Sequence, residues 1–208
     1  MNNADVALLI SGFALLISII SLYINSLSPF RLKISHDSPT FTIYTITPQI
    51  SGDRENKTWW IPSFDIGISF YNSGKVSGEI LDIRITAEFK GQRSSSKHTF
   101  YPKWIVNYSE FKACKGNRMK WIDKSVIREW YPLLLKGESD TSLHLILESD
   151  RWDQKLFGEM TFDIEVISSK NKKWIKHGSY SLPIIECMYA ISQSHTVYDK
   201  SIEELRKL

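Results

Sequence analysis

The chain separates into one long apolar run followed by short segments in which apolar and polar residues alternate. The run extends from Val6 to Ile24 without a charge, and the next charged residue is Arg31. A helix rises about 1.5 Å per residue, so the run can cross a hydrocarbon core of about 30 Å. A signal peptide would have a basic residue before the run, where only Asp5 is charged, and a soluble core helix would show a polar face. We therefore predict one transmembrane helix within an anchor of residues 1–30.

Beyond the anchor, apolar side chains fall on every second residue of several short segments. The clearest ones are Phe64–Phe70, Ile83–Phe89, Leu143–Leu147 and Met160–Val166. A period of two with one polar face predicts half-buried antiparallel strands. Further strands are expected at Phe30–Ile34 and Phe41–Ile43, and Trp174–Leu182 is expected to form a hairpin with Met160–Ile167. Seven or more short strands separated by turn residues predict an antiparallel β-sandwich over residues 31–208.

Two segments break the alternation and are expected to be helical. The first has an apolar stripe spaced three, four and four residues apart, made of Met119, Ile122, Val126 and Trp130. Pro132 is expected to end this helix. At the C-terminus, Ser201 and Glu204 have the spacing of a capping box in front of a short apolar face. The sandwich is therefore expected to carry a short helical insertion and a short C-terminal helix.

Two turns in the β-region resemble those of bacterial immunoglobulin-like modules. The stretch Phe70–Gly74 ends a strand in an Asn-x-Gly turn and leads into Gly78–Ile83, and Leu134–Ser139 is similar to a later Gly-Glu-Ser turn of these modules. The resemblance implies a mainly β fold: a membrane-anchored, immunoglobulin-like antiparallel β-sandwich behind a single transmembrane helix. It carries over no catalytic residue.

Composition narrows the classes of partner. The net charge of +3 over 208 residues gives no overall signature of nucleic-acid binding, so nucleic acid is not an expected partner. The two cysteines, Cys114 and Cys187, have no metal or redox spacing, which favours free thiols and a reducing compartment. Because Arg31 and Lys33 follow the apolar run and no basic residue precedes it, the positive-inside rule predicts a cytoplasmic C-terminal domain at the cell membrane.

Small and hydrogen-bonding residues recur along the predicted transmembrane helix at alternating spacings of three and four. After Ala4 these are Ala7, Ser11, Ala14, Ser18, Ser21 and Asn25. In lipid, helices associate where small side chains let their backbones approach. The pattern favours a packing seam for a second copy or for another membrane protein, and chance spacing is the alternative.

Catalytic motifs are not found. The five histidines are far apart, and none has a Cys, Asp or Glu at ligand spacing. Glu148, Asp150 and Asp153 cluster, but helix capping before Trp152 is the favoured explanation, and His144 is expected on the exposed face of its strand. We therefore expect a protein that is not an enzyme and needs no cofactor or metal.

A basic stretch with interleaved aromatic residues is the most suggestive surface. Its members are Lys112, Lys115, Arg118, Lys120, Trp121, Lys124 and Arg128. A second stretch surrounds Trp174 with Lys170, Lys172, Lys173, Lys176 and His177. Such groups suit anionic lipid headgroups or single-stranded nucleic acid, and the alternative is a solvated loop whose tryptophans lie in the core.

Three functions remain open at this point. The first is a cytoplasmic interaction or sensor domain, tethered by its helix, that binds a protein or a small signal. The second is a membrane-perturbing effector of a bacterial, anti-phage type defence system, in which the domain senses a partner and the helices cluster. The third is an envelope-facing carbohydrate-binding module, which requires exposed, coplanar tryptophans.

Overall fold

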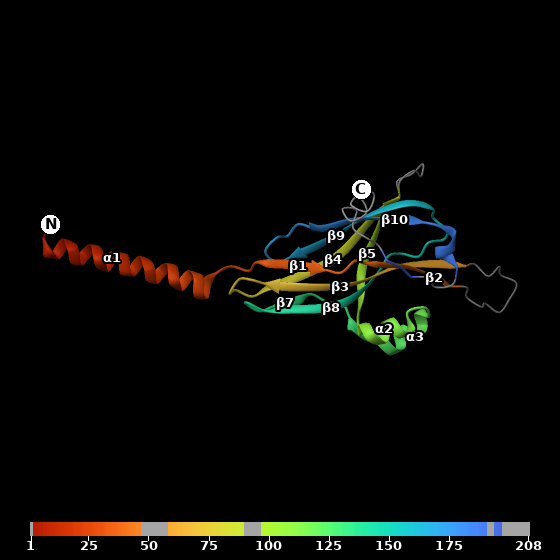
Figure 1. Cartoon of the computed structure of the whole chain (residues 1–208), viewed down its shortest axis with the longest axis horizontal. Helices are drawn as coiled ribbons and strands as arrows, with labels where there is room; N and C mark the ends of the chain where they lie inside the picture. The colour runs from red at the N-terminus through yellow and green to blue at the C-terminus, as the bar shows by residue number, and fades with distance from the viewer. Residues whose placement is uncertain (1, 47–57, 90–96, 191–193, 197–208) are drawn as a thin grey trace, which may run out of the picture.

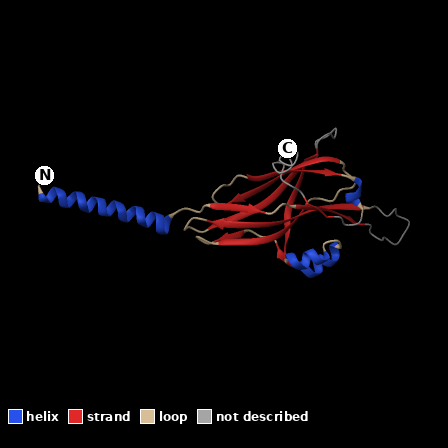
Figure 2. Ribbon diagram, viewed as in Figure 1, coloured by secondary structure: helices blue, strands red, loops and turns tan. Residues whose placement is uncertain are grey.

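The computed structural model describes residues 2–46, 58–89, 97–190 and 194–196, and it consists of one apolar helix and a β-domain (Figures 1 and 2). The helix α1 (Asn3–Leu22) continues directly into a π-helical turn, η1 (Tyr23–Leu27). Residues Ala4–Leu27 are long and apolar enough to cross a membrane, and none of them is buried against the domain. The predicted helix is therefore present, and its apolar side chains are uncovered.

The rest of the described chain is mostly β-structure. The strands are β1 (Leu32–His36), β2 (Thr40–Ile46), β3 (Trp59–Asn72), β4 (Gly78–Phe89), β5 (Lys97–Val106), β6 (Val126–Glu129), β7 (Leu133–Leu135), β8 (Asp140–Glu148), β9 (Gly158–Ser168), β10 (Ile175–Ile184) and β11 (Ser194–Thr196). The remaining helices are α2 (Tyr108–Cys114), α3 (Arg118–Ser125) and a 3₁₀ turn, η2 (Glu186–Tyr189).

The strands form one antiparallel sheet that nearly closes into a barrel. Its order is β10-β9-β4-β5-β8-β3-β2-β11, and β1 pairs with the end of β3 that β2 does not reach. At the two edges, His36 Nδ1 of β1 lies 3.4 Å from the Tyr180 hydroxyl of β10. The mainly β, antiparallel prediction is thus confirmed, including the β9–β10 hairpin. The immunoglobulin-like sandwich stays a prediction.

The interior is filled by the apolar positions of the alternating segments. The side chains of β3, β4 and β9 that were expected to point inward are all buried. The Phe64 ring lies at the centre, with its centroid 4.8 Å from that of Phe41, 4.9 Å from Phe100 and 4.6 Å from Phe162. Period-two patterning therefore located the core correctly.

The predicted helix over Met119–Trp130 is wrong in its length and in its buried face. It ends at Ser125, whose hydroxyl donates to the Trp121 carbonyl (2.6 Å), and Val126 begins strand β6. Val126 and Ile127 are β-branched, which favours the extended backbone that pairs with β5. The helix buries Trp121 while Met119 is 73% exposed. The predicted C-terminal helix, Ser201–Leu208, lies outside the described residues.

Candidate functional site

The helical insertion, residues Asn107–Ser125, packs on the outer face of the sheet. Asn107 and Asn117 cap α2 and α3 by accepting hydrogen bonds from backbone N–H groups of the first turn of each helix. A second, smaller core lies beneath the helices, formed by Tyr44, Val106, Phe111, Trp121 and Ile146. Burial in this core raises the pKa of the Tyr44 hydroxyl. Trp121 is fully buried, so it offers no face to a partner.

Two cations of the predicted basic surface point inward. Lys115 Nζ lies 2.5 Å from Asp65 Oδ2. Arg118 donates two hydrogen bonds to Glu148, from Nε to Oε1 at 3.1 Å and from Nη2 to Oε2 at 2.9 Å. Both carboxylates lie on the outer face of the sheet and are buried. Because a buried charge needs a partner, these two pairs attach the insertion to the sheet.

The other cations of this surface face outward. Lys112, Lys120 and Lys124 are exposed, and Arg128 is half-buried with its guanidinium 4.2 Å from the centroid of Tyr131. Lys120 and Lys124 border a hollow of about 390 Å³ between the helices, which Glu110, Ala113 and Cys114 also line. The structure therefore exposes three of the six predicted cations, with Lys120 and Lys124 beside the hollow and Lys112 next to Tyr108 on α2.

Two expectations about individual side chains are wrong. His144 is not a surface residue, because its ring packs against Tyr108 (4.5 Å between centroids, tilted by 38°) and its Nε2 lies 3.3 Å from Asp65 Oδ1. Glu148 belongs to strand β8, where Arg118 covers it, so helix capping does not explain the acidic cluster. In both cases the insertion covers a polar strand position that the alternation places outside.

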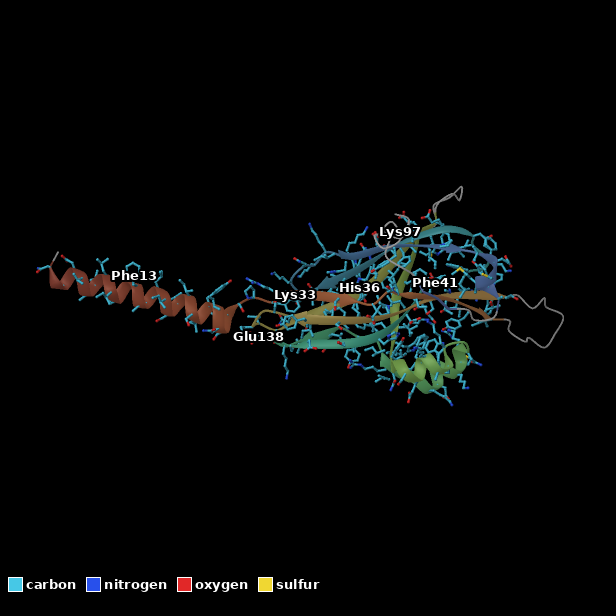
Figure 3. The ribbon with its side chains drawn as sticks, in the orientation of Figure 1. Phe13, Lys33, His36, Phe41, Lys97 and Glu138 are labelled. Carbon is cyan, nitrogen blue, oxygen red and sulfur yellow. The ribbon has the colours of Figure 1, made fainter. Side chains whose placement is uncertain are left out.

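The turns at the end of the β-domain nearest α1 form a second unit, which we term the helix-proximal end. It consists of the β3–β4 turn (73–77), the β7–β8 turn (136–139) and the β9–β10 loop (169–174) (Figures 1 and 3). Asn72 at the end of β3 is fully buried there. Its Nδ2 donates to the Val76 and Lys136 carbonyls, both at 2.9 Å, and its Oδ1 accepts from Gly74 N (2.9 Å) and Arg31 N (3.1 Å).

Asn72 therefore uses the full hydrogen-bonding capacity of its carboxamide to join two turns to the segment that follows α1. That segment, Ser28–Arg31, lies directly on the turns. Lys75 N and Val76 N both donate to the Ser28 carbonyl, at 3.0 and 3.1 Å. Phe30 is only 5% exposed and belongs to the core of the β-domain.

Glycine makes this close approach sterically feasible. A Cβ at Gly74 would collide with the Pro29 carbonyl, and one at Gly78 would collide with the Phe30 ring. The chain consequently passes from the last helical residue, Leu27, to a docked segment without a free linker. Sequence patterning indicated a turn at Asn72–Gly74 but missed its contact with the segment after the helix, because that contact spans about forty residues.

The small residues of α1 share one face, and all of them are exposed. Their polar groups are satisfied within the helix: Ser11 Oγ donates to Leu8 O (2.9 Å), and Ser18 Oγ donates to Ala14 O (2.8 Å). Asn25 Nδ2 donates to Ser21 Oγ at 3.1 Å. Packing of this face, which also includes Ala7, against another helix stays a prediction, and it would depend on close backbone approach more than on new hydrogen bonds.

The tryptophans do not form an exposed, coplanar surface on which a sugar ring could stack. All seven lie within the described residues, and each is buried or half-buried. Trp104 meets Trp121 edge to face at 78°, and Trp174 lies under the Arg84 guanidinium, 4.1 Å from its centroid. This arrangement argues against a carbohydrate platform. Within the described residues, no group of three His, Cys, Asp or Glu side chains is placed to hold a metal, and both cysteines are free.

Comparison with known proteins adds little. No family model matches the chain, and no curated protein matches it. A crystal structure of a Bordetella pertussis protein described as ApaA aligns with 81% of this chain and 95% of its own at 10% identity, with a TM-score of 0.29. An X-ray structure of a Northeast Structural Genomics Consortium target aligns with 79% of this chain and 91% of its own, also at 10% identity, with a TM-score of 0.30. Neither similarity defines the fold or function of this chain.

Proposed function

We propose that this chain is a single-pass membrane protein whose cytoplasmic, immunoglobulin-like β-domain binds another protein and does not catalyse a reaction. The observation that carries the proposal is the docked junction, in which Asn72 ties Arg31 to two turns of the domain and Ser28 is bonded to one of them. A domain attached in this way presents its surfaces at a fixed height and orientation relative to the membrane.

The binding face in this proposal is the outward side of the helical insertion. It combines the exposed Lys112, Lys120 and Lys124 with Met119, and methionine is enriched at protein interfaces. Asp65, beneath the insertion, precedes Asn72 by seven residues on β3, which places the insertion roughly 20 Å from the junction. Charge effects are screened over about 10 Å at 0.1 M salt, so these lysines suit an acidic protein better than lipid.

Photo-crosslinking tests this face. A photoreactive residue replaces Met119 in the full-length chain in its native membrane, and a matched one replaces Phe157, which is exposed elsewhere on the domain. We expect a discrete adduct from position 119 alone, and its loss when Lys112, Lys120 and Lys124 are changed together to Glu. Equal products from both positions, or none from position 119, would contradict the proposal.

The cytoplasmic orientation is tested separately with the free thiols. Cys187 is exposed, so a thiol reagent that cannot cross membranes reaches it only from the side on which the domain lies. We expect labelling after permeabilisation and none in intact cells. Labelling of intact cells would reverse the topology.

A membrane-perturbing effector is the second candidate, and the same junction favours it. A rigid connection would transmit a change in the β-domain to α1, whose small-residue face permits helix clustering. The effector would be supported if overexpression of the chain is toxic and a charged residue in place of Ala14 abolishes the toxicity. If neither the wild-type chain nor the chain with a charge at Ala14 affects growth, the effector is contradicted and the interaction protein remains as the proposal.

A further inference from the structure

The helix-proximal end, taken together with residues 28–33 and the first residues of β4 and β8, holds more net positive charge than the whole chain. The four segments 28–33, 73–79, 136–140 and 169–174 contain the cations Arg31, Lys33, Lys75, Lys136, Lys170, Lys172 and Lys173 and the carboxylates Glu79, Glu138 and Asp140. Their net charge is +4, against +3 for all 208 residues. The remainder of the molecule is therefore slightly negative, and the charge asymmetry points toward α1.

These segments are held together by hydrogen bonds and form one surface. The β9–β10 loop is fixed to the start of β4 because Ser169 N donates to Glu79 O and Glu79 N donates to Ser169 Oγ, both at 2.9 Å. Asn72 joins the other two turns. Figure 3 shows Lys33 and Glu138 at this same end of the domain.

The lysines of this surface point to solvent. Lys136, Lys170, Lys172 and Lys173 are exposed, and within the described ranges none of them forms an ion pair. Glu138 is neutralised by Lys75, with Nζ 2.6 Å from Oε2. The other two acids, Glu79 and Asp140, are exposed and are already counted in the net charge of +4.

The position of this surface relative to the end of α1 determines which molecules it can contact. The segment after Leu27 has no slack, since Ser28 already accepts hydrogen bonds from Lys75 N and Val76 N. If α1 crosses a bilayer up to Leu27, the β3–β4 turn lies in the headgroup layer, which is about 5–7 Å thick on each side. Val76 is 45% exposed in that turn, so the turn presents an apolar side chain beside its lysine.

We propose that the helix-proximal end binds anionic phospholipid headgroups, with Lys170, Lys172 and Lys173 as its main contacts. The inference rests on the proposed membrane anchor and names the lipid class that the junction meets. Because Asn72 and Phe30 make the junction stiff, binding of the loop to the headgroups tilts helix and domain as one body. Lipid charge would then set the direction in which the helical insertion faces.

The experiment uses the full-length chain, with both native cysteines replaced by Ser and a fluorophore at Asn171→Cys in the loop or, as a distal control, at Phe157→Cys. The protein is reconstituted into vesicles of phosphatidylcholine, alone or with phosphatidylserine, that carry a headgroup-attached quencher. Quenching reports the ratio of bound to unbound loop. We expect phosphatidylserine to increase quenching at position 171 and not at position 157, and salt to reverse it.

Charge variants provide the decisive comparison. Each lysine near an anionic surface is worth about fivefold in binding, so Lys170, Lys172 and Lys173 changed to Gln should lower the ratio by about a hundredfold, and changed to Glu by more. The matched triple change of Lys112, Lys120 and Lys124 to Glu alters the net charge as much as the Glu triple of the loop does, and it should leave the ratio unchanged. Equal losses from both triples, or quenching that ignores phosphatidylserine, would overturn the proposal.

Failure of the anchor is distinguished by flotation. All variants should float with the vesicles and resist alkaline extraction. A chain that does not float contradicts the proposed membrane anchor, whereas a floating chain with an unresponsive loop contradicts only the lipid contact.

Discussion

Two regions of the molecule are rich in lysine and arginine, and they use those cations in opposite ways. Six cations lie within the seventeen positions from Lys112 to Arg128, yet Lys115 and Arg118 point inward to buried carboxylates. At the helix-proximal end the cations come from four separate segments, and most of them face outward. Some cations of a dense basic run in the sequence therefore stabilise the fold by pairing with buried carboxylates. A surface of one sign is instead assembled from residues far apart.

The inward pairs make the largest prediction. Arg118→Met should lower the free energy of unfolding by about 3 kcal/mol, because it removes the bidentate partner of the buried Glu148 and leaves only Lys103, whose Nζ lies 3.3 Å from Oε2. Lys124→Met, an exposed cation of the same insertion, should change it by less than about 0.5 kcal/mol. Denaturant unfolding measures both. If the two variants lose similar stability, the division between inward and outward cations is wrong.

At the other region, Asn72→Ala should cost about 2–3 kcal/mol, since buried backbone groups of two turns and of Arg31 lose their partners. Ser73→Ala is the matched control, because the Ser73 hydroxyl makes one exposed bond to the Arg31 carbonyl. Thermal unfolding compares the two. An Asn72→Ala chain that is as stable as Ser73→Ala would show that the junction is not held by this side chain.

The same contrast explains what sequence patterning could and could not predict. Period-two alternation located β3, β4, β8 and β9 because each strand has its own polar face. It failed at Val126, where pairing with β5 overrides a helical stripe. The roles of Arg118 and Asn72 depend on partners thirty to sixty residues away, at Glu148 and Lys136, which no local pattern reveals. The cation count alone therefore favoured the insertion as the anionic-partner surface.

A pH dependence of stability is expected from histidines outside both regions. Burial lowers the pKa of His98 below its usual 6.5, and burial together with the nearby His36 lowers that of His177. The folded state then binds fewer protons than the unfolded state, so stability is present above pH 6.5 and is lost as the pH falls below it. Burial raises the pKa of Asp82, which acts in the opposite direction.

Substitution isolates the histidine contribution. His98→Phe keeps an aromatic ring against Phe89 and Trp152 but cannot be protonated, so its stability should fall less steeply between pH 6.5 and lower values. Urea unfolding over this range, with the wild-type chain beside it, checks the difference. Parallel curves would assign the pH dependence to other groups.

The smallest effect concerns the small-residue face of α1. Ala14 and Ser18 changed together to Ile should weaken self-association of the helix in bilayers, because the backbones can no longer approach. Ser18 already bonds to its own helix, and an interhelical hydrogen bond adds only about 0.6 kcal/mol on average. Leu15 and Ile19 changed to other large apolar residues should have little effect. Energy transfer between labelled chains measures self-association. If the Ala14/Ser18 and Leu15/Ile19 variants self-associate equally, α1 serves only as a membrane anchor.

The stiffness of the junction is the central claim, and a distance distribution tests it most directly. Spin labels at Ile20→Cys in α1 and Leu134→Cys on β7 are introduced into the full-length chain, with both native cysteines replaced by Ser, in lipid nanodiscs. Pulsed electron resonance should give one narrow distance distribution. Asn72→Ala, or a Gly-Ser insertion after Leu27, should broaden it, because each frees the segment that now lies on the turns. A wild-type distribution as broad as that of the insertion variant would contradict the account.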